Sequence, residues 1–266
     1  MVGRSVPTYL LTIAYDGSNY HGWQRQPGVR TVQEELEKGL RRIDCPVAVH
    51  GAGRTDTGVH AFAQCAHIEL PRAFPEGRLA LAINSNIPED ISVRRAIVAP
   101  EGFHARFHAR GKRYAYRVIC SAEKPAIGRA YFHWSRREVD LEAMRRAAQC
   151  LRGKHDFASF ATNPGYSRSR GTVRRLSHVH LMRRRNGFDF VVQGSGFLYN
   201  MVRNLVGTLL EVGYGNRPPE WLADVLNGCD RRLGGPTAPA RGLYLQRVLY
   251  APGYAPGAEI PGEDLV

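Results

Sequence analysis

The chain has 266 residues, of which 43% are hydrophobic and 23% are charged, close to the averages of globular proteins. This composition excludes an intrinsically disordered or collagen-like chain, and the length suits one large domain or two small ones. The 37 Lys and Arg against 24 Asp and Glu leave a net charge of +13. Such an excess favours a polyanionic partner, and nucleic acid is the commonest one for a basic soluble protein.

The sequence carries no signal for a membrane span, for export or for a metal. No apolar run approaches the ~18–20 residues of a membrane span, and no secretory leader is recognisable, so we expect a cytoplasmic protein. The five cysteines are scattered without a C-x-x-C pair, which argues against disulfides or a zinc ribbon. His104 and His108 have a spacing that two metal ligands on a helix could use, but arginines surround them and no third ligand completes the set.

The first half of the chain is predicted to contain several strands and one helix. Residues 9–15 form a strand-like run that ends in a turn cluster, 16–19. Thr31 and Glu34 form a capping-box pattern, and apolar residues follow at helical spacing from Val32, which predicts an amphipathic helix. Shorter strands are expected over residues 47–50, 67–70, 93–98 and 113–120.

The second half repeats this mixture of helices and strands. Asp140 is a good N-cap for a helix, and Asn186-Gly187 is typical of a hairpin turn between strands over 173–180 and 188–193. A third helix is expected from about Met201 to Gly213 or Gly215, a fourth after Pro218-Pro219, and a last strand over 244–250.

These elements predict an α+β protein with two lobes of similar size. The boundary is expected near residues 127–139, which gives an N-terminal lobe, 1–130, and a C-terminal lobe, 131–250. Residues 251–266 are rich in Gly and Pro and are acidic, so they are predicted to be a disordered tail.

Basic residues are concentrated in two runs. Seven arginines and no acid lie between Ser167 and Arg185, and seven Lys or Arg lie between Arg94 and Arg117 against Glu101 alone. Such a run can simply be a solvated face, but five interleaved aromatic residues favour phosphate binding with base stacking. These are Phe103, Phe107, Tyr114, Tyr116 and Tyr166. The second run also contains a local repeat, Phe103-His-Ala-Arg106 followed directly by Phe107-His-Ala-Arg110.

The segment most suited to chemistry is the glycine-rich stretch of residues 51–61. Its three glycines allow the backbone to approach a ligand closely, and Arg54 and Asp56 lie two residues apart within it. The pair is consistent with a carboxylate kept ionised by a guanidinium and able to act as a nucleophile. Alternatively, Asp56 caps a turn and Arg54 is a surface residue. Walker-A, H-E-x-x-H and G-x-S-x-G motifs are absent from the sequence.

The stretch Gly53-Arg-Thr-Asp56-x-Gly-Val-His-Ala61 resembles the signature of the TruA family of tRNA pseudouridine synthases. Further segments resemble the family in the same order along the chain. They are Tyr15-Asp-Gly-Ser-x-Tyr20-x-Gly-Trp-Gln24, Thr31-Val-Gln-Glu34, Phe103-His-Ala-Arg-Phe107, Lys112-Arg-Tyr114-x-Tyr116, Asp156-Phe157, Ser159-Phe160, Gly196-Phe-Leu-Tyr-Asn-Met-Val-Arg203-Asn204 and Gly242-Leu243. The matches run from about residue 10 to residue 250.

The resemblance implies an isomerase that detaches uracil from its ribose, rotates it and rejoins it through C5, without a cofactor or a metal. It implies Asp56 as the nucleophile, Arg203 as the residue that keeps Asp56 ionised, and Arg54 as the residue that enters the RNA and displaces the target nucleotide. Tyr114 and Leu243 would bind the uracil. Tyr116 is expected to be structural.

The resemblance also implies substrate, fold and assembly. The expected targets are uridines 38, 39 and 40 in the anticodon stem and loop of tRNA, and the expected form is a homodimer. The expected fold is two α/β lobes about a mainly antiparallel sheet, with the active-site cleft between them. Thr57 departs from the alanine usual in the family, and the second Phe-His-Ala-Arg unit adds His108 to the basic segment.

Two other functions fit parts of the sequence. A tRNA-binding protein without catalysis would keep the basic surface, although Asp56, Tyr114 and Arg203 are all present. An RNA phosphodiesterase could use Asp56 with His60 as acid and base, although carboxylates are not clustered in the sequence.

Overall fold

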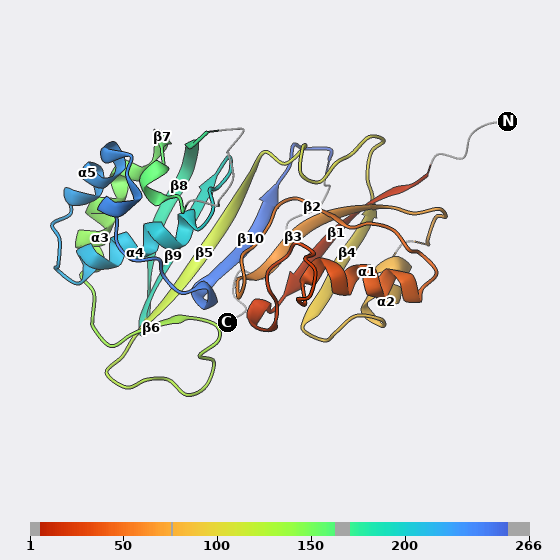
Figure 1. Cartoon of the computed structure of the whole chain (residues 1–266), viewed down its shortest axis with the longest axis horizontal. Coiled ribbons are helices and arrows are strands. Elements are labelled where there is room, and N and C mark those ends of the chain that lie inside the picture. Colours follow the sequence, from red (N-terminus) through yellow and green to blue (C-terminus); the bar gives the residue numbers. More distant parts are fainter. Residues whose placement is uncertain (1–5, 76, 163–170, 255–266) are drawn as a thin grey trace. The chain divides into compact units, whose positions relative to one another are not determined.

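The computed structural model describes two compact units. One comprises residues 6–110 with 245–254, and the other comprises residues 111–244 (Figure 1). The described residues are 6–75, 77–162 and 171–254. Each unit has helices and a mainly antiparallel sheet, so the predicted α+β class is confirmed.

The bounds of the compact units differ from those of the predicted lobes, 1–130 and 131–250. The strand β5 (Gly111–Cys120) belongs to the second unit, and most of the last strand, β10 (Leu243–Leu249), belongs to the first. The division of the site between the two predicted lobes remains a prediction. Of the predicted tail, residues 251–254 are described and the remainder lies outside the described residues.

The first unit has a sheet in which β1 is central. In order, its strands are β4 (Ile91–Val98), β1 (Thr8–Tyr15), β3 (His60–Glu69) and β10, and β2 (His50–Gly51) pairs with β3. β1 is antiparallel to both β3 and β4. Leu11 and Ile13 of β1 are fully buried, so this strand supplies much of the core.

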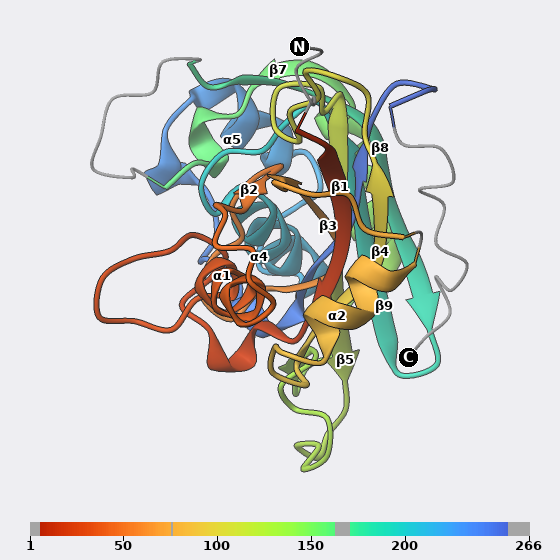
Figure 2. The same ribbon diagram turned by 90° about the vertical axis from the view of Figure 1, so that its right-hand side faces the viewer.

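Helix α1 (Val32–Arg42) forms where the capping pattern predicts it. The Thr31 hydroxyl accepts a hydrogen bond from the Glu34 amide at 3.4 Å. Val32, Leu36 and Leu40 are fully buried on one face. The second helix of this unit, α2 (Arg78–Asn84), was not predicted. It follows Gly77, whose φ is +72°, without a side-chain cap, so no start signal marks it. Figure 2 shows α1 and α2 beside β1.

The strand predicted over residues 47–50 was largely wrong, because only His50 is in β2. The Val49 amide donates to the Glu37 carboxylate at 3.2 Å, and the Val47 amide donates to the Cys45 carbonyl at 2.8 Å. These donors are therefore unavailable to a neighbouring strand. The strand predicted over 67–70 is real but begins much earlier, at His60.

The second unit has a four-stranded antiparallel sheet. Its order is β5 (Gly111–Cys120), β9 (Gly187–Gly194), β8 (Val173–Arg184) and β7 (Gly153–Asp156). A short strand, β6 (His133–Ser135), runs parallel to β5. The predicted hairpin is confirmed, since Arg184 pairs with Gly187 across the turn. The short strands β6 and β7 were not predicted.

Three helices of the second unit pack together on its sheet (Figure 1). They are α3 (Leu141–Ala148), α4 (Met201–Gly213) and α5 (Trp221–Gly228), all near their predicted positions. Asp140 caps α3 by accepting from the Ala143 amide at 2.9 Å. Among the described residues, no helix combines the length and the apolar character that crossing a membrane requires.

Three histidine rings of the first unit lie in contact with one another. Ring centroids are 4.9 Å apart for His50 and His67 and 4.4 Å apart for His67 and His104. His67 is only 4% exposed, and its Nδ1 accepts the Ala105 amide at 3.2 Å. Burial, with the two neighbouring histidines, lowers the pKa of His67 to about 4. This ring is therefore neutral at pH 7.

We expect the free energy of unfolding to decrease as the pH falls from about 6.5 to 4. In that window unfolded His67 binds a proton and folded His67 does not, so acid favours the unfolded chain. The lowering of the His67 pKa from 6.5 to about 4 corresponds to about 3.4 kcal/mol over the whole window. Urea unfolding at pH 7, 5.5 and 4.5 measures it, and a His67→Gln variant should have a flatter dependence. Equal slopes in the parent and the variant would contradict the assignment to His67.

Candidate active site

Asp56 lies in a loop of the first unit that joins β2 to β3. This segment, residues 52–59, is called the Asp56 loop below. Arg54 and Thr57 are exposed, Thr55 is buried and Asp56 is half-buried. The buried Thr55 therefore anchors the loop, while the residues on either side of it reach toward solvent.

The backbone of the Asp56 loop is held by the segment that follows β1. The Trp23 amide donates to the Thr55 carbonyl at 3.1 Å, and the Gly58 amide donates to the Tyr20 carbonyl at 3.3 Å. The hydroxyls of Tyr15 and Thr55 are 2.8 Å apart and share a hydrogen bond. Asp56 is thus bracketed by fixed neighbours, which limits the positions its carboxylate can reach.

Two glycines allow this close approach between the segments. Gly22 has a φ of +83°, and a Cβ there would lie 2.4 Å from the Thr55 carbonyl oxygen. A Cβ at Gly17 would lie 2.1 Å from the Val59 carbonyl oxygen. Both distances are shorter than real contacts, so a side chain at either glycine would displace the Asp56 loop.

His60 is placed as a structural residue. It is 2% exposed, its Nδ1 accepts the Gly17 amide at 3.1 Å, and the same atom lies 3.1 Å from Asp16 Oδ1. An acid or base for RNA cleavage must reach the substrate. The burial of His60 therefore argues against the phosphodiesterase alternative.

The predicted uracil-binding residues lie in the second unit. Tyr114 is on β5 opposite Val192, is 7% exposed, and meets the ring of Phe197 edge-on at 5.0 Å. Leu243 begins β10 and is 5% exposed. Tyr116 is fully buried and donates to the Pro239 carbonyl at 2.8 Å, in keeping with the structural role expected for it.

Arg203 is half-buried in the first turn of α4. Its Nε donates to the Ala238 carbonyl at 2.7 Å, and its Nη1 donates to Asn200 Oδ1 at 2.8 Å. Two of the three guanidinium nitrogens are therefore engaged, which fixes the plane in which Nη2 points.

Sequence reasoning did not single out the contribution of Asn200. This residue precedes α4 with a φ of +59°, a conformation that asparagine tolerates better than most residues. Its spacing of three from Arg203 places the two side chains on one side of the helix start, and that spacing could have revealed it. The buried Asn204 amide, which donates to the Phe160 carbonyl at 2.8 Å, further secures this turn.

The predicted site residues fall into two groups by unit. Asp56 and Arg54 belong to the first unit, whereas Tyr114, Arg203 and Leu243 belong to the second. Within the described residues, no three His, Cys, Asp or Glu side chains gather in a way that could hold a metal ion.

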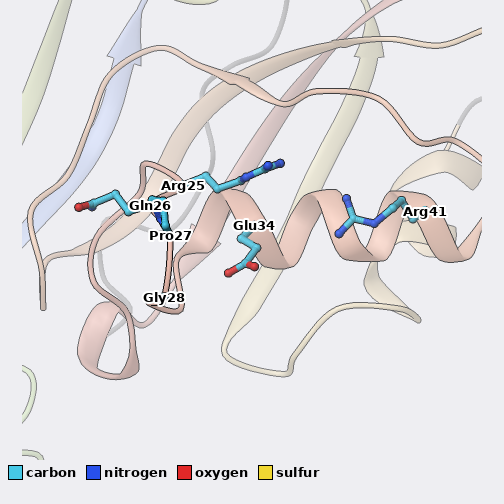
Figure 3. Close-up of a pocket in the computed structure, with 6 residues that line it drawn as sticks. All are labelled: Arg25, Gln26, Pro27, Gly28, Glu34 and Arg41. Carbon is cyan, nitrogen blue, oxygen red and sulfur yellow. The ribbon is translucent and has the colours of Figure 1, made fainter.

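A separate hollow of about 410 Å³ lies in the first unit beside α1 (Figure 3) and contains none of the predicted site residues. It is lined by Arg25, Gln26, Pro27, Gly28, Glu34 and Arg41.

Comparison with known proteins identifies the family to which this chain belongs. The family model described as tRNA pseudouridine synthase matches residues 11–108 and 147–251, and the chain belongs to this family. Of the predicted site residues, Arg54, Asp56, Arg203 and Leu243 lie inside the matched ranges. Tyr114 lies between the two ranges.

Individual relatives match nearly the whole chain. A protein of Geobacillus kaustophilus named tRNA pseudouridine synthase A is 44% identical over 240 residues, which cover 90% of this chain and 92% of the relative. Proteins of the same name from Limosilactobacillus fermentum and Halalkalibacterium halodurans are 44% and 45% identical. These alignments cover 91% and 89% of this chain, and 95% and 90% of the respective relatives.

Proposed function

We propose that this protein isomerises uridine to pseudouridine at positions 38, 39 and 40 in the anticodon stem and loop of tRNAs. The observation that carries the proposal is the similarity to proteins named tRNA pseudouridine synthase A over about nine-tenths of the chain. The net charge of +13 suits a polyanionic substrate.

Asp56 is the nucleophile in this proposal. The reaction breaks the bond between N1 and the ribose and forms one between C5 and the ribose, while the C5 proton is lost and N1 gains a proton. Substrate and product are isomers, so no group donor or redox cofactor is consumed. The anchored Thr55 and the turn at Gly58 support this role, because they hold the backbone on both sides of Asp56.

The remaining residues bind the substrate or position the nucleophile. Arg203 keeps Asp56 ionised, and its hydrogen bonds to Asn200 and Ala238 support a fixed orientation of the guanidinium. The exposed Arg54 enters the RNA and helps to extrude the target nucleotide, which a stacked uridine requires before it can react. Tyr114 and Leu243 contact the extruded uracil.

The protein is proposed to work in the cytoplasm as a homodimer, a form that would suit a substrate longer than one 29.7-kDa subunit.

Release of tritium from tRNA transcripts labelled at C5 of uridine tests the reaction. We expect release in proportion to pseudouridine, with the modified positions mapping to 38–40. Modification elsewhere would keep the reaction but overturn the choice of site. Tight tRNA binding without release would favour the alternative of a binding protein without catalysis, and cleaved RNA would favour a phosphodiesterase.

A further inference from the structure

The tandem repeat over residues 103–110 places its two phenylalanines in opposite environments. Phe103 is 3% exposed, whereas Phe107 is 65% exposed. Burying a phenylalanine side chain stabilises a fold by about 1.5–3 kcal/mol. The exposed Phe107 does not contribute this stabilisation. The exposed ring is part of neither the core nor the predicted catalytic set.

The buried Phe103 packs against residues that hold this segment in place. The Phe103 ring stacks on His108 with centroids 5.5 Å apart and an interplanar angle of 17°, and His108 stacks in turn on Tyr254 at 4.9 Å. The His104 amide also donates to His108 Nδ1 at 3.0 Å. These contacts fix the backbone that carries Phe107.

Phe107 is the outer end of a series of four rings, each in contact with the next. Its ring lies 4.1 Å from that of His104, with an interplanar angle of 30°, and His104 continues to His67 and His50. His104 Nδ1 accepts the Arg106 amide at 3.2 Å, and desolvation lowers the pKa of His104. A neutral ring therefore supports one face of Phe107, and the 65% exposure leaves its other face available.

The surroundings of this ring favour an anionic partner. Arg106 and Arg110 are exposed on either side of Phe107 in the sequence, and Glu101 is the one acid between Arg94 and Arg117. A flat ring beside guanidinium groups is the arrangement that binds unstacked bases with their phosphates. A purely apolar protein partner would gain nothing from these charges.

We infer that Phe107 is a stacking platform for an unpaired base of the tRNA, with Arg106 and Arg110 binding the adjacent phosphates. This inference rests on the proposed function and adds a binding site outside the residues proposed to act on the target uridine. Because the site binds RNA and does not react, its loss should raise KM and leave kcat unchanged at saturating tRNA.

The test compares tRNA affinity and turnover of Phe107 variants with those of the parent. One stacked base is worth about 1–3 kcal/mol, so Phe107→Ala should weaken binding by about 5- to 150-fold, and Phe107→Leu should weaken it similarly because the flat face is lost. Phe107→Trp should retain affinity, and saturating tRNA should quench its added fluorescence. Val98→Ala, which removes an equally exposed apolar side chain of the same unit, is the matched control and should bind normally.

Several outcomes would overturn the inference. If Phe107→Ala binds within twofold of an active parent, or Phe107→Leu binds as well as the parent, the stacking site is wrong and the proposed function stands. If the substitution changes the sedimentation of the protein and not its RNA affinity, Phe107 contacts a second copy of the chain instead. A parent that neither binds nor modifies tRNA would overturn the proposed function as well.

Discussion

Replacing Asp56 by Asn is expected to abolish pseudouridine formation while leaving folding and tRNA affinity nearly unchanged. The amide has almost the same shape as the carboxylate, but it is not a nucleophile. Loss of a group that acts directly in the chemistry typically lowers kcat by at least about 10⁴-fold. The measurement is tritium release under single-turnover conditions, together with filter binding of labelled tRNA.

The matched control for this substitution is Asp224→Asn, the same chemical change at an exposed position on α5. It should retain full activity. Pseudouridine formation by the Asp56→Asn protein would contradict the role of Asp56. If the variant loses tRNA binding together with its activity, Asp56 is needed for binding or folding, and its proposed role as a nucleophile would lose this support.

Replacing Gly22 by Ala is expected to destabilise the protein and to reduce its activity together. The new Cβ would meet the Thr55 carbonyl oxygen at 2.4 Å, and the φ of +83° strains any L side chain. Strain of this backbone conformation costs about 1–2 kcal/mol and overpacking about 1–3 kcal/mol. Urea unfolding should therefore show a loss of about 2–5 kcal/mol. In the folded fraction, kcat should decrease because Thr55 immediately precedes Asp56.

Gly28→Ala separates backbone strain from crowding. Gly28 has a similar φ of +75°, but a Cβ there would meet nothing within 4 Å. This variant should lose only about 1–2 kcal/mol and keep its kcat. Equal losses of stability and activity in the two variants would show that the contact between Gly22 and the Asp56 loop has no special importance.

Elements with strong local signals were predicted from the sequence. Helix α1 has an N-cap at Thr31 and a buried stripe at helical spacing, and α4 has a longer apolar stripe. In both cases the local hydrogen bonds of the helix and the burial of its apolar face favour the same conformation. The hairpin at Asn186-Gly187 was predictable for a similar reason, because its turn chemistry is local.

Elements that depend on distant partners were not predicted well. Residues 47–49 have strand-like composition, but their amides bond to Glu37 and to the Cys45 carbonyl instead of a strand. Helix α2 lacks a start signal. It contacts β4, and no local sequence pattern predicts this contact. Packing against residues far along the chain decided these cases.

The same distinction, between features with local signals and features that depend on distant partners, applies to the candidate site. The glycine-rich composition of residues 51–61 and its arginine–aspartate pair indicated Asp56 and Arg54, and the likeness to a family indicated Tyr114, Arg203 and Leu243. The anchoring of Thr55 by Tyr15 and Trp23, and the orientation of Arg203 by Asn200, were not predicted. Hydrogen bonds between separate segments depend on how those segments pack.

The sequence alone determined the class of protein, the glycine-rich loop that carries the proposed nucleophile and the basic character that suits an RNA substrate. The class was indicated by the resemblance of several motifs to a known family, and the other two properties follow from residue type and spacing. Only the tertiary structure decided that Phe103 is buried while Phe107 is exposed, and that His67 is neutral at pH 7. Two copies of one short motif have the same local preferences, so their different burial is set by the neighbours that each one meets in the folded chain.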